Sequence, residues 1–320
     1  MDLSIIIVNW NSVNYLKECL KSILQETKGI DFEIIVVDNA SYDGSEQMIA
    51  TEFTEVKFVQ SNENGGFAKA NNLGFKNASG RNLLFLNPDT LIIGSAIRDM
   101  LEFLDARSDA GAVGCKLLYS DLTLQLHSVQ PYPTVINQVL DIDYLKNNWP
   151  HWKLWGMKAL YQESNQPEKV EVVPGACLMI KRDVFEEVDL FSEDYFMYAE
   201  DIDLCYKVNQ TKRKVFFVKG AEVVHHGGAS SRKEKINYFS VVLTKEAVFR
   251  FLNKTRGKGT AISYRIVMSF IAIGRMGVLI LAMPWANWKG QGIAVKGTFN
   301  KWRKILSWSI GLEKWARKLR

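Results

Sequence analysis

Three carboxylates stand within four residues near the middle of the chain, at Glu200, Asp201 and Asp203. The apolar residues around them recur at spacings of three and four, which predicts a packed helix with the acids in its first turn: Ile202, Leu204, Cys205 and Val208. The positive end of that helix favours an ionised acid. An ionised, positioned carboxylate can take a proton from an attacking hydroxyl group. The same pattern is also typical of an N-capping acid on a solvated helix face.

The elements that would position these acids begin with two apolar runs that end in polar side chains. Residues 4–8 lead to Asn9, and residues 33–37 lead to Asp38 and Asn39. Residues 13–25 between them have helical spacing, so the three segments predict a parallel βαβ unit with a right-handed crossover. Ligands bind outside the carboxyl ends of such strands, where these polar residues fall.

Two further runs end in the same way. Residues 56–59 lead into Asn64, Gly65 and Gly66 before a helical stretch, and residues 82–86 lead to Asn87 and Asp89. A glycine pair lets the backbone approach a ligand, and helix N-terminal amides favour anions such as a diphosphate. A glycine pair alone is usually only a turn, and a single acid after a strand is most often a turn or a cap. Polar residues after four successive strands favour a shared ligand site.

The order and approximate spacing of seven segments resemble the family 2 glycosyltransferases of the GT-A fold, in particular the bacterial rhamnosyltransferase-like branch: residues 4–11, 37–41, 64–68, 86–89, 173–176, 198–201 and 224–230. The resemblance covers roughly residues 3–231. It implies an α/β fold of GT-A type, with a Rossmann-like, mostly parallel central sheet flanked by helices. It also implies a nucleoside diphosphate sugar as donor and a saccharide hydroxyl as acceptor.

The resemblance assigns a role to each polar strand end. Asp38 would hold the base or ribose of the donor, with the other donor-binding residues being Asn9, Asn39, Asn64, Gly65, Gly66, Asn87 and Gly175. Asn87 replaces the first acid of the family's Asp-x-Asp motif, so Asp89 would bind the divalent cation, Mg²⁺ or Mn²⁺. His225 would complete the metal or diphosphate site, with His226 as the alternative. Asp201 would be the general base of inverting transfer, Glu200 a second contact to the acceptor and Asp203 structural.

The charge is divided sharply along the chain. Residues 232–320 contain 19 Lys and Arg against 3 acidic residues, a net +16, and the rest of the chain carries a net −11. We therefore expect a catalytic domain over residues 1–231, with a nucleotide-sugar half at about 1–115 and an acceptor half at about 116–231. A basic helical tail over residues 232–320 would bind an anionic membrane surface. No nucleic-acid reader motif accompanies the charge.

The tail has two apolar stripes. Residues 264–285 are interrupted by Arg265 and Arg275, so their uncharged runs are shorter than the ~18 residues of a membrane span. Their apolar face suits a helix lying in the membrane interface: Ile266, Phe270, Ile273 and Leu281. The second stripe is predicted to do the same: Ile305, Trp308, Leu312, Trp315 and Leu319. A helical hairpin packed on the enzyme or on a second subunit is the alternative.

Four separated cysteines and an N-terminus that leads directly into the first strand indicate a cytoplasmic protein, peripheral on the inner face of the membrane. We expect an inverting glycosyltransferase of bacterial surface polysaccharide synthesis that uses dTDP-rhamnose and a lipid-linked acceptor. A UDP-hexose or UDP-N-acetylhexosamine donor is the alternative. A nucleotidyltransferase and a non-catalytic scaffold of a polysaccharide-assembly complex are alternatives from other classes. A homo-oligomer is compatible with the sequence.

Overall fold

The computed structural model of the chain describes residues 1–163, 166–227 and 236–319. The chain forms two compact units. The first comprises Met1–Tyr132, Asn148–Phe196 and Glu200–Gly227, and the second comprises Pro133–Asn147, Met197–Ala199 and Gly228–Arg320. The second unit therefore includes two internal segments as well as the tail. The expected domain boundary at residue 231 lies outside the described residues.

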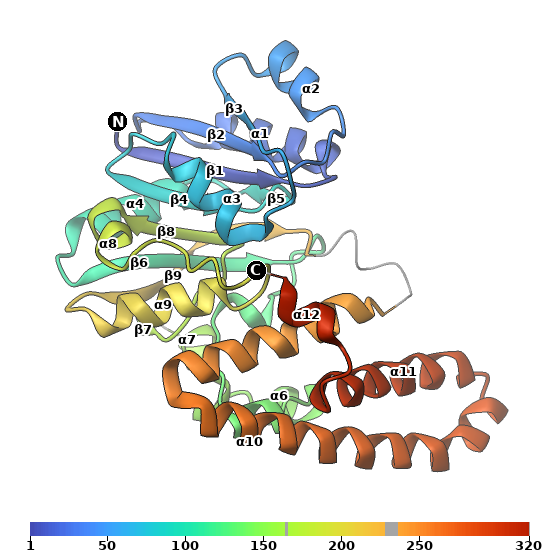
Figure 1. The fold of residues 1–320 in the computed structure, drawn as a ribbon. Coiled ribbons are helices and arrows are strands. Elements are labelled where there is room, and N and C mark those ends of the chain that lie inside the picture. The colour runs from blue at the N-terminus through green and yellow to red at the C-terminus, as the bar shows by residue number, and fades with distance from the viewer. Residues whose placement is uncertain (164–165, 228–235, 320) are drawn as a thin grey trace. The chain divides into compact units, whose positions relative to one another are not determined.

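The first unit is built on a mixed β-sheet (Figure 1). The strand order is β3-β2-β1-β4-β8-β6-β9-β5, with β7 beside β9. Strands β3, β2, β1 and β4 are parallel to one another, as the βαβ pattern predicts, whereas β8 runs antiparallel to β4. The strands are β1 (Leu3–Asn9), β2 (Phe32–Asp38), β3 (Lys57–Gln60), β4 (Asn82–Leu86), β5 (Thr90–Ile92), β6 (Ala110–Leu118), β7 (Glu168–Val170), β8 (Cys177–Lys181) and β9 (Lys214–His225).

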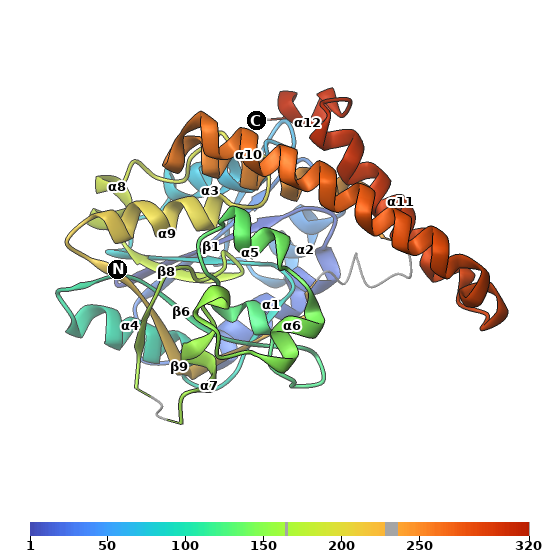
Figure 2. The ribbon, with the colours of Figure 1, turned by 90° about the horizontal axis from the view of Figure 1, so that it is seen from below.

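Helices cover both faces of this sheet because successive side chains of each strand point to opposite sides. In β1, Leu3, Ile5 and Ile7 pack with α1, α2 and α4 on one face, and Ile6 packs with α3, α8 and α9 on the other (Figure 2). The helices of this unit are α1 (Val13–Glu26), α2 (Ser45–Glu52), α3 (Gly66–Phe75), α4 (Ala96–Ala106), α7 (Lys158–Tyr161), α8 (Arg182–Glu187) and α9 (Glu200–Gln210), with 3₁₀ turns η1 (Leu126–Ser128) and η2 (Lys153–Trp155).

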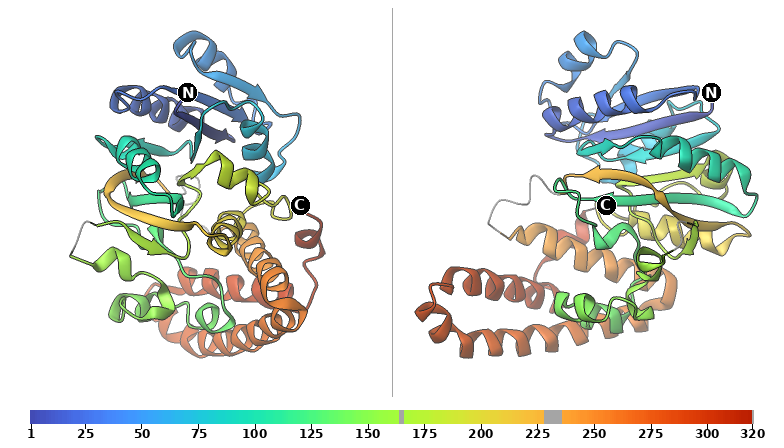
Figure 3. Two further views of the ribbon diagram at one scale, coloured as in Figure 1. Left: turned by 90° about the vertical axis from the view of Figure 1, so that its left-hand side faces the viewer. Right: turned by 180° about the vertical axis from the view of Figure 1, so that it is seen from behind.

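The second unit is helical. Its elements are α5 (Val135–Val139), α6 (Asp143–Asn148), α10 (Tyr238–Trp288), α11 (Gly292–Ser309) and α12 (Lys314–Lys318). Helices α10 and α11 pack along each other (Figure 3). A non-helical Gly257, with φ +85°, breaks α10, and side chains from both sides of this break share one core, among them Leu252 and Tyr264.

The tail differs in part from the sequence prediction. Ile305 and Trp308 are fully buried in the core of the second unit, where the Trp308 Nε1–H donates to Glu246 Oε2 at 2.8 Å. Helix α11 ends at Ser309, so the predicted second stripe is not one continuous surface helix. The stripe was misread because an apolar helix face does not reveal whether lipid or another helix covers it.

The first predicted stripe is exposed. Ile266, Phe270, Ile273 and Leu281 are 52, 71, 55 and 83% exposed. Among the described residues, α10 is the one helix long and apolar enough to cross a membrane by length and composition, although Arg265 and Arg275 lie on it. Only 11% of its most apolar 18-residue segment is buried. A helix lying in the membrane interface stays a prediction.

Candidate active site

The carboxyl ends of β1 and β2 bring Asn9 and Asp38 together. The parallel register pairs these two residues, and Asn9 Nδ2 donates to Asp38 Oδ1 at 2.8 Å. Asp38 Oδ2 accepts from the Ser41 backbone N–H at 3.0 Å and from Gln60 Nε2 at 2.9 Å. Although burial alone raises the pKa of Asp38, the bonds from Ser41, Gln60 and Asn9 hold that pKa below its usual range.

These hydrogen bonds show that the Asp38 carboxylate stabilises the loop that follows β2. The residue is 1% exposed, and its carboxylate already holds the turn that contains Ala40 and Tyr42, both with positive φ. A direct contact with a nucleotide base or ribose stays a prediction. Asn9 Oδ1, in contrast, is buried with no hydrogen-bond partner among the described residues, which leaves an acceptor beside this loop.

The predicted phosphate loop is joined to this strand end by Asn39. Its backbone N–H donates to the Asn9 carbonyl at 2.8 Å, and its side chain donates to Asn64 Oδ1 at 2.9 Å and accepts from the Gly65 N–H at 3.1 Å. The Gly66 N–H donates to Asn64 Oδ1 at 3.0 Å. The structure thus places all the donor-binding residues predicted on β1, β2 and the α3 loop in one hydrogen-bonded group.

Close backbone approaches connect this group to the acidic helix. Gly66 has φ +83°, and a Cβ there would lie 2.1 Å from the Phe196 carbonyl oxygen, which accepts the Phe67 N–H at 3.0 Å. A Cβ on Gly175 would lie 3.2 Å from the Phe67 ring and 3.5 Å from Asp201 Cβ. The start of α3, the loop before β8 and the start of α9 therefore meet at two glycines.

Asp201 and Glu200 begin α9 as the spacing predicts. Asp201 Oδ2 accepts the Gly175 N–H at 2.9 Å, and Oδ1 accepts the Ile202 N–H at 2.8 Å. Burial raises the pKa of Asp201 despite these two donors. Burial, followed by the charge of Asp201, raises the pKa of Glu200 well above its usual value. Burial thus acts against the helix end and raises the pKa of both acids.

Glu200 and Asp203 differ in their surroundings. Glu200 Oε2 is buried and has no hydrogen-bond partner within the described residues. Asp203 is fully buried and accepts from Ser192 Oγ at 2.5 Å and from the Tyr195 hydroxyl at 3.4 Å. These bonds hold the loop before α9, which is the structural role expected of Asp203.

The register of β5 with β9 brings Asp89 to His225. Thr90 pairs with His225, and His225 Nε2 lies 3.3 Å from both Asp89 Oδ1 and Asn87 Nδ2. Although burial raises it, the pKa of Asp89 is held below its usual range by His225. The Asn87 N–H donates to the Ala176 carbonyl at 3.0 Å, which ties this group to the loop that holds Asp201.

A cation would suit this donor set. Asp89 Oδ1 and His225 Nε2 lie 3.3 Å apart, so one divalent cation could contact both the carboxylate oxygen and the imidazole nitrogen. The described residues contain no group of three His, Cys, Asp or Glu side chains that could hold a metal. Asp89 and His225 would therefore supply part of a coordination shell, as expected from the absence of the first acid at Asn87.

The two histidines have different partners. His225 Nδ1 lies 3.2 Å from Gln125 Oε1, and Gln125 Nε2 donates to the His225 carbonyl at 2.5 Å, so Gln125 orients the ring. His226 Nδ1 instead lies 2.8 Å from Ser120 Oγ, and its ring lies beside Tyr15. The geometry favours His225 over His226 as the ligand. No signal in the sequence singled out Gln125, because its contact with His225 is formed only by the fold.

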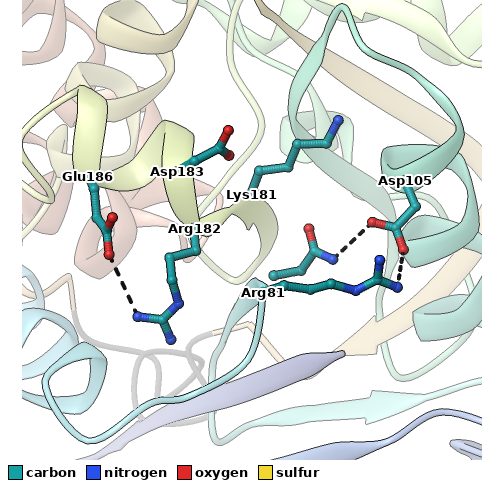
Figure 4. Close-up of a pocket in the computed structure, with 7 residues that line it drawn as sticks. Arg81, Asp105, Lys181, Arg182, Asp183 and Glu186 are labelled. Carbon is teal, nitrogen blue, oxygen red and sulfur yellow. Dashed lines mark hydrogen bonds and ion pairs between the residues drawn. The ribbon is translucent and has the colours of Figure 1, made fainter. Parts of the chain in front are cut away.

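An open pocket at the opposite end of the central strands does not belong to this site. It is lined by residues from the start of β4, the end of α4, the end of β8 and α8 (Figure 4). Arg81 pairs with Asp105, and Arg182 lies 3.8 Å from Glu186. The positive and negative side chains that line the pocket balance each other. The pocket also lies at the amino end of β4, away from Asp89.

Comparisons with known proteins fit this geometry. Residues 4–189 match the model of the family "Glycosyl transferase family 2". The chain is 27% identical to the O-antigen biosynthesis protein RfbC of Myxococcus xanthus. That match covers 73% of this chain but only 18% of RfbC. It is 25% identical to an N-acetylglucosaminyl-diphospho-decaprenol L-rhamnosyltransferase of Mycobacterium tuberculosis, over 74% of this chain and 80% of that protein.

A solved structure is similar over almost the whole chain. The mannosyltransferase PcManGT from Pyrobaculum calidifontis, in complex with GDP-Man and Mn²⁺, superposes with a TM-score of 0.62 at 16% identity. The match covers 98% of this chain and 87% of that chain. At this identity the likeness shows the fold, which is the GT-A fold expected from the sequence.

Proposed function

We propose an inverting sugar transfer for this chain, because it belongs to glycosyl transferase family 2, whose model matches residues 4–189. The chain is a glycosyltransferase of GT-A fold, and its activity serves polysaccharide synthesis. The donor is a nucleoside diphosphate sugar, and the acceptor is a hydroxyl group of a saccharide. The group of Asn9, Asp38, Asn39, Asn64, Gly65 and Gly66 binds the donor.

Rhamnose carried by dTDP is the first choice of donor. This choice is supported by the Mycobacterium tuberculosis relative, which is named a rhamnosyltransferase. A UDP-hexose or UDP-N-acetylhexosamine is the second choice. The acceptor is lipid-linked, in keeping with the diphospho-decaprenol in the name of that relative. A peripheral position on the inner face of the cell membrane, supported by the exposed apolar face of α10, would bring the enzyme to such an acceptor.

Asp89 and His225 hold a divalent cation, Mg²⁺ or Mn²⁺, with Asn87 beside them. When bound, the cation supplies positive charge to the leaving diphosphate. Mn²⁺ in the structure of the Pyrobaculum calidifontis enzyme supports this assignment. Backbone amides at Gly65 and Gly66 are further donors for the negative charge that develops on the diphosphate.

Asp201 acts as the general base. The acceptor oxygen forms a bond to the anomeric carbon, the bond from that carbon to the diphosphate oxygen breaks, and the acceptor proton passes to the Asp201 carboxylate. The products are the glycosylated acceptor and a nucleoside diphosphate. The Gly175 and Ile202 amides hold both oxygens of Asp201 in place, and its raised pKa makes it a stronger base.

The observation that carries this proposal is the meeting of three loops at Gly66 and Gly175. The Phe67 N–H at the start of α3 donates to the carbonyl of Phe196, in the segment before α9. In the loop before β8, the Gly175 N–H donates to Asp201 and the Ala176 carbonyl accepts from Asn87, which lies beside Asp89 and His225. The proposed base, cation site and phosphate loop are connected by direct backbone contacts, which supports a reaction in which donor and acceptor must be held in a fixed geometry.

The test is an assay of nucleoside diphosphate release from dTDP, UDP and GDP sugars with a lipid-linked saccharide acceptor. Asp201→Asn should lower kcat about 10²- to 10⁴-fold with little change in donor KM. The rate should rise with pH through the pKa of Asp201, and that limb should vanish in the variant. The control is Asp31→Asn, which removes an exposed carboxylate.

The two other classes predict different results. A nucleotidyltransferase would release inorganic diphosphate and not a nucleoside diphosphate. A scaffold would show no turnover with any donor, and Asp201→Asn would leave polysaccharide synthesis in cells unchanged. The loss of the first acid at Asn87 is the observation that keeps the scaffold in view, but the ordered contacts of Asp89, His225 and Asp201 favour the enzyme.

A further inference from the structure

A buried glutamine lies behind the ring of His225. Gln125 is fully buried just before the 3₁₀ turn η1, and hydrogen bonds fix its backbone on both sides. Its N–H donates to the Leu117 carbonyl at 2.9 Å, and its carbonyl accepts from the Ser128 N–H at 3.0 Å and from Ser128 Oγ at 2.7 Å. The backbone of the first unit therefore holds the Gln125 side chain in one place beside the candidate cation site.

Two backbone carbonyls decide which end of the Gln125 amide faces the ring. Gln125 Nε2 donates to the Leu118 carbonyl at 3.1 Å and to the His225 carbonyl at 2.5 Å. Because a carbonyl oxygen only accepts hydrogen bonds, the opposite orientation of the amide would set oxygen against oxygen at both contacts. Gln125 Oε1 is therefore the atom that lies 3.2 Å from His225 Nδ1.

The orientation of the amide locates the proton of the imidazole ring. Because Gln125 Oε1 is also only an acceptor, His225 Nδ1 must carry a proton and donate it. A neutral imidazole has a single N–H, so His225 Nε2 then carries a lone pair. Two groups lie 3.3 Å from that nitrogen, the donor Asn87 Nδ2 and the acceptor Asp89 Oδ1. The lone pair and the carboxylate oxygen repel each other, and a cation in contact with both would turn this repulsion into binding.

We infer that Gln125 is a positioning residue that fixes His225 as a nitrogen ligand of the divalent cation and prevents it from donating a hydrogen bond to the diphosphate. This inference rests on the proposed function, which supplies the cation and the diphosphate. A ring with its proton on Nε2 would donate to an oxygen atom, either of the diphosphate or of Asp89. The ring held by Gln125 offers a lone pair at that position, which is what a metal ion binds.

The first test locates the proton in the full chain without donor or metal. Nitrogen-15 NMR of protein labelled at its histidines distinguishes a protonated Nδ1 from a protonated Nε2. At pH ~9 an imidazole with the ordinary pKa of about 6.5 is neutral, and His225→Ala identifies the signals of His225. We expect the Nδ1–H tautomer in the wild type and a shift toward the Nε2–H tautomer in Gln125→Met, which has a side chain of similar length without the amide. A wild-type His225 with its proton on Nε2 would overturn the inference, even if Gln125→Met fails to fold.

The second test is titration with Mn²⁺ in the presence of dTDP, UDP or GDP, followed by electron paramagnetic resonance. Gln125→Met should weaken Mn²⁺ binding about 10- to 100-fold, as the loss of a group that orients a metal ligand does. The matched control is Ser128→Ala, which removes a buried hydroxyl from the Gln125 backbone but keeps the amide on the ring.

The control should retain both the tautomer and the Mn²⁺ affinity. An equal loss in Ser128→Ala would mean that Gln125 only supports the loop, and an unchanged affinity in Gln125→Met would also overturn the inference. Failure of the wild type to bind Mn²⁺ with any of the three nucleotides would do the same. If the wild type binds Mn²⁺ but releases no nucleoside diphosphate from any donor, the proposed function alone is refuted.

Discussion

Replacing Gly66 by alanine tests the close packing at the centre of the site. A non-glycine residue at the observed φ of +83° costs about 1–2 kcal/mol. The new Cβ would lie 2.1 Å from the Phe196 carbonyl oxygen, so Phe196 must move. That movement breaks the 3.0 Å bond from the Phe67 N–H, and an unsatisfied group costs about 1–3 kcal/mol. Gly66→Ala should therefore destabilise the protein by about 2–5 kcal/mol.

Gly44 offers a matched control. It has φ +92°, but a Cβ there would meet no atom within 4 Å. Gly44→Ala should therefore cost only the backbone term, about 1–2 kcal/mol. Urea denaturation followed by circular dichroism measures both variants, and only Gly66→Ala should also raise the KM for the donor. Equal destabilisation by the two substitutions, or an unchanged donor KM for Gly66→Ala, would refute the reasoning.

Two further predictions concern the acid helix α9 and the proposed cation site. Because burial raises the pKa of Glu200, the folded chain keeps that proton to a higher pH than the unfolded chain, and stability is lost as pH rises toward the folded pKa. Glu200→Gln, which cannot ionise, should therefore be more stable than the wild type at alkaline pH and about equally stable near pH ~4. Thermal melts of both proteins across this pH range measure the effect, and a difference in melting temperature that does not change with pH would contradict it. Asp89→Ala should abolish the metal-dependent thermal shift produced by dTDP, UDP or GDP sugars, whereas His226→Ala should retain it because that ring contacts Ser120. Equal loss in both variants would mean that His226 is also a ligand.

Strand ends and periodicity predicted much of the half that we expect to bind the nucleotide sugar. The runs that lead to Asn9 and Asp38 are β1 and β2, and the helical pattern between them is α1, because a buried strand and an amphipathic helix each have a local signature. The antiparallel β8 and the register that sets Asp89 beside His225 have no such signature. Both depend on pairing between segments far apart in the chain.

The contacts that make the site specific were also beyond the sequence. Gly66 could be recognised as a turn former, but its need for a positive φ against Phe196 follows from tertiary packing. The raised pKa of Asp201 and Glu200 depends on burial, which residue type alone does not give. In the tail, the pattern identified Trp308 as apolar but could not show that Glu246 and the helical core, and not lipid, surround it.

The position of β8 between β4 and β6 has a consequence for synthesis on the ribosome. Strands β1 to β4 can pair as soon as residue 86 has emerged, but the open edge of β4 waits for Cys177–Lys181. At ~5–20 residues per second, this wait lasts on the order of 5–20 s. During that interval the nascent chain presents the unpaired, wholly apolar edge segment Leu-Leu-Phe-Leu, residues 83–86, to any other strand nearby. The order of strands in the sheet thus makes the half-made chain, and not the finished enzyme, the form most in need of a chaperone.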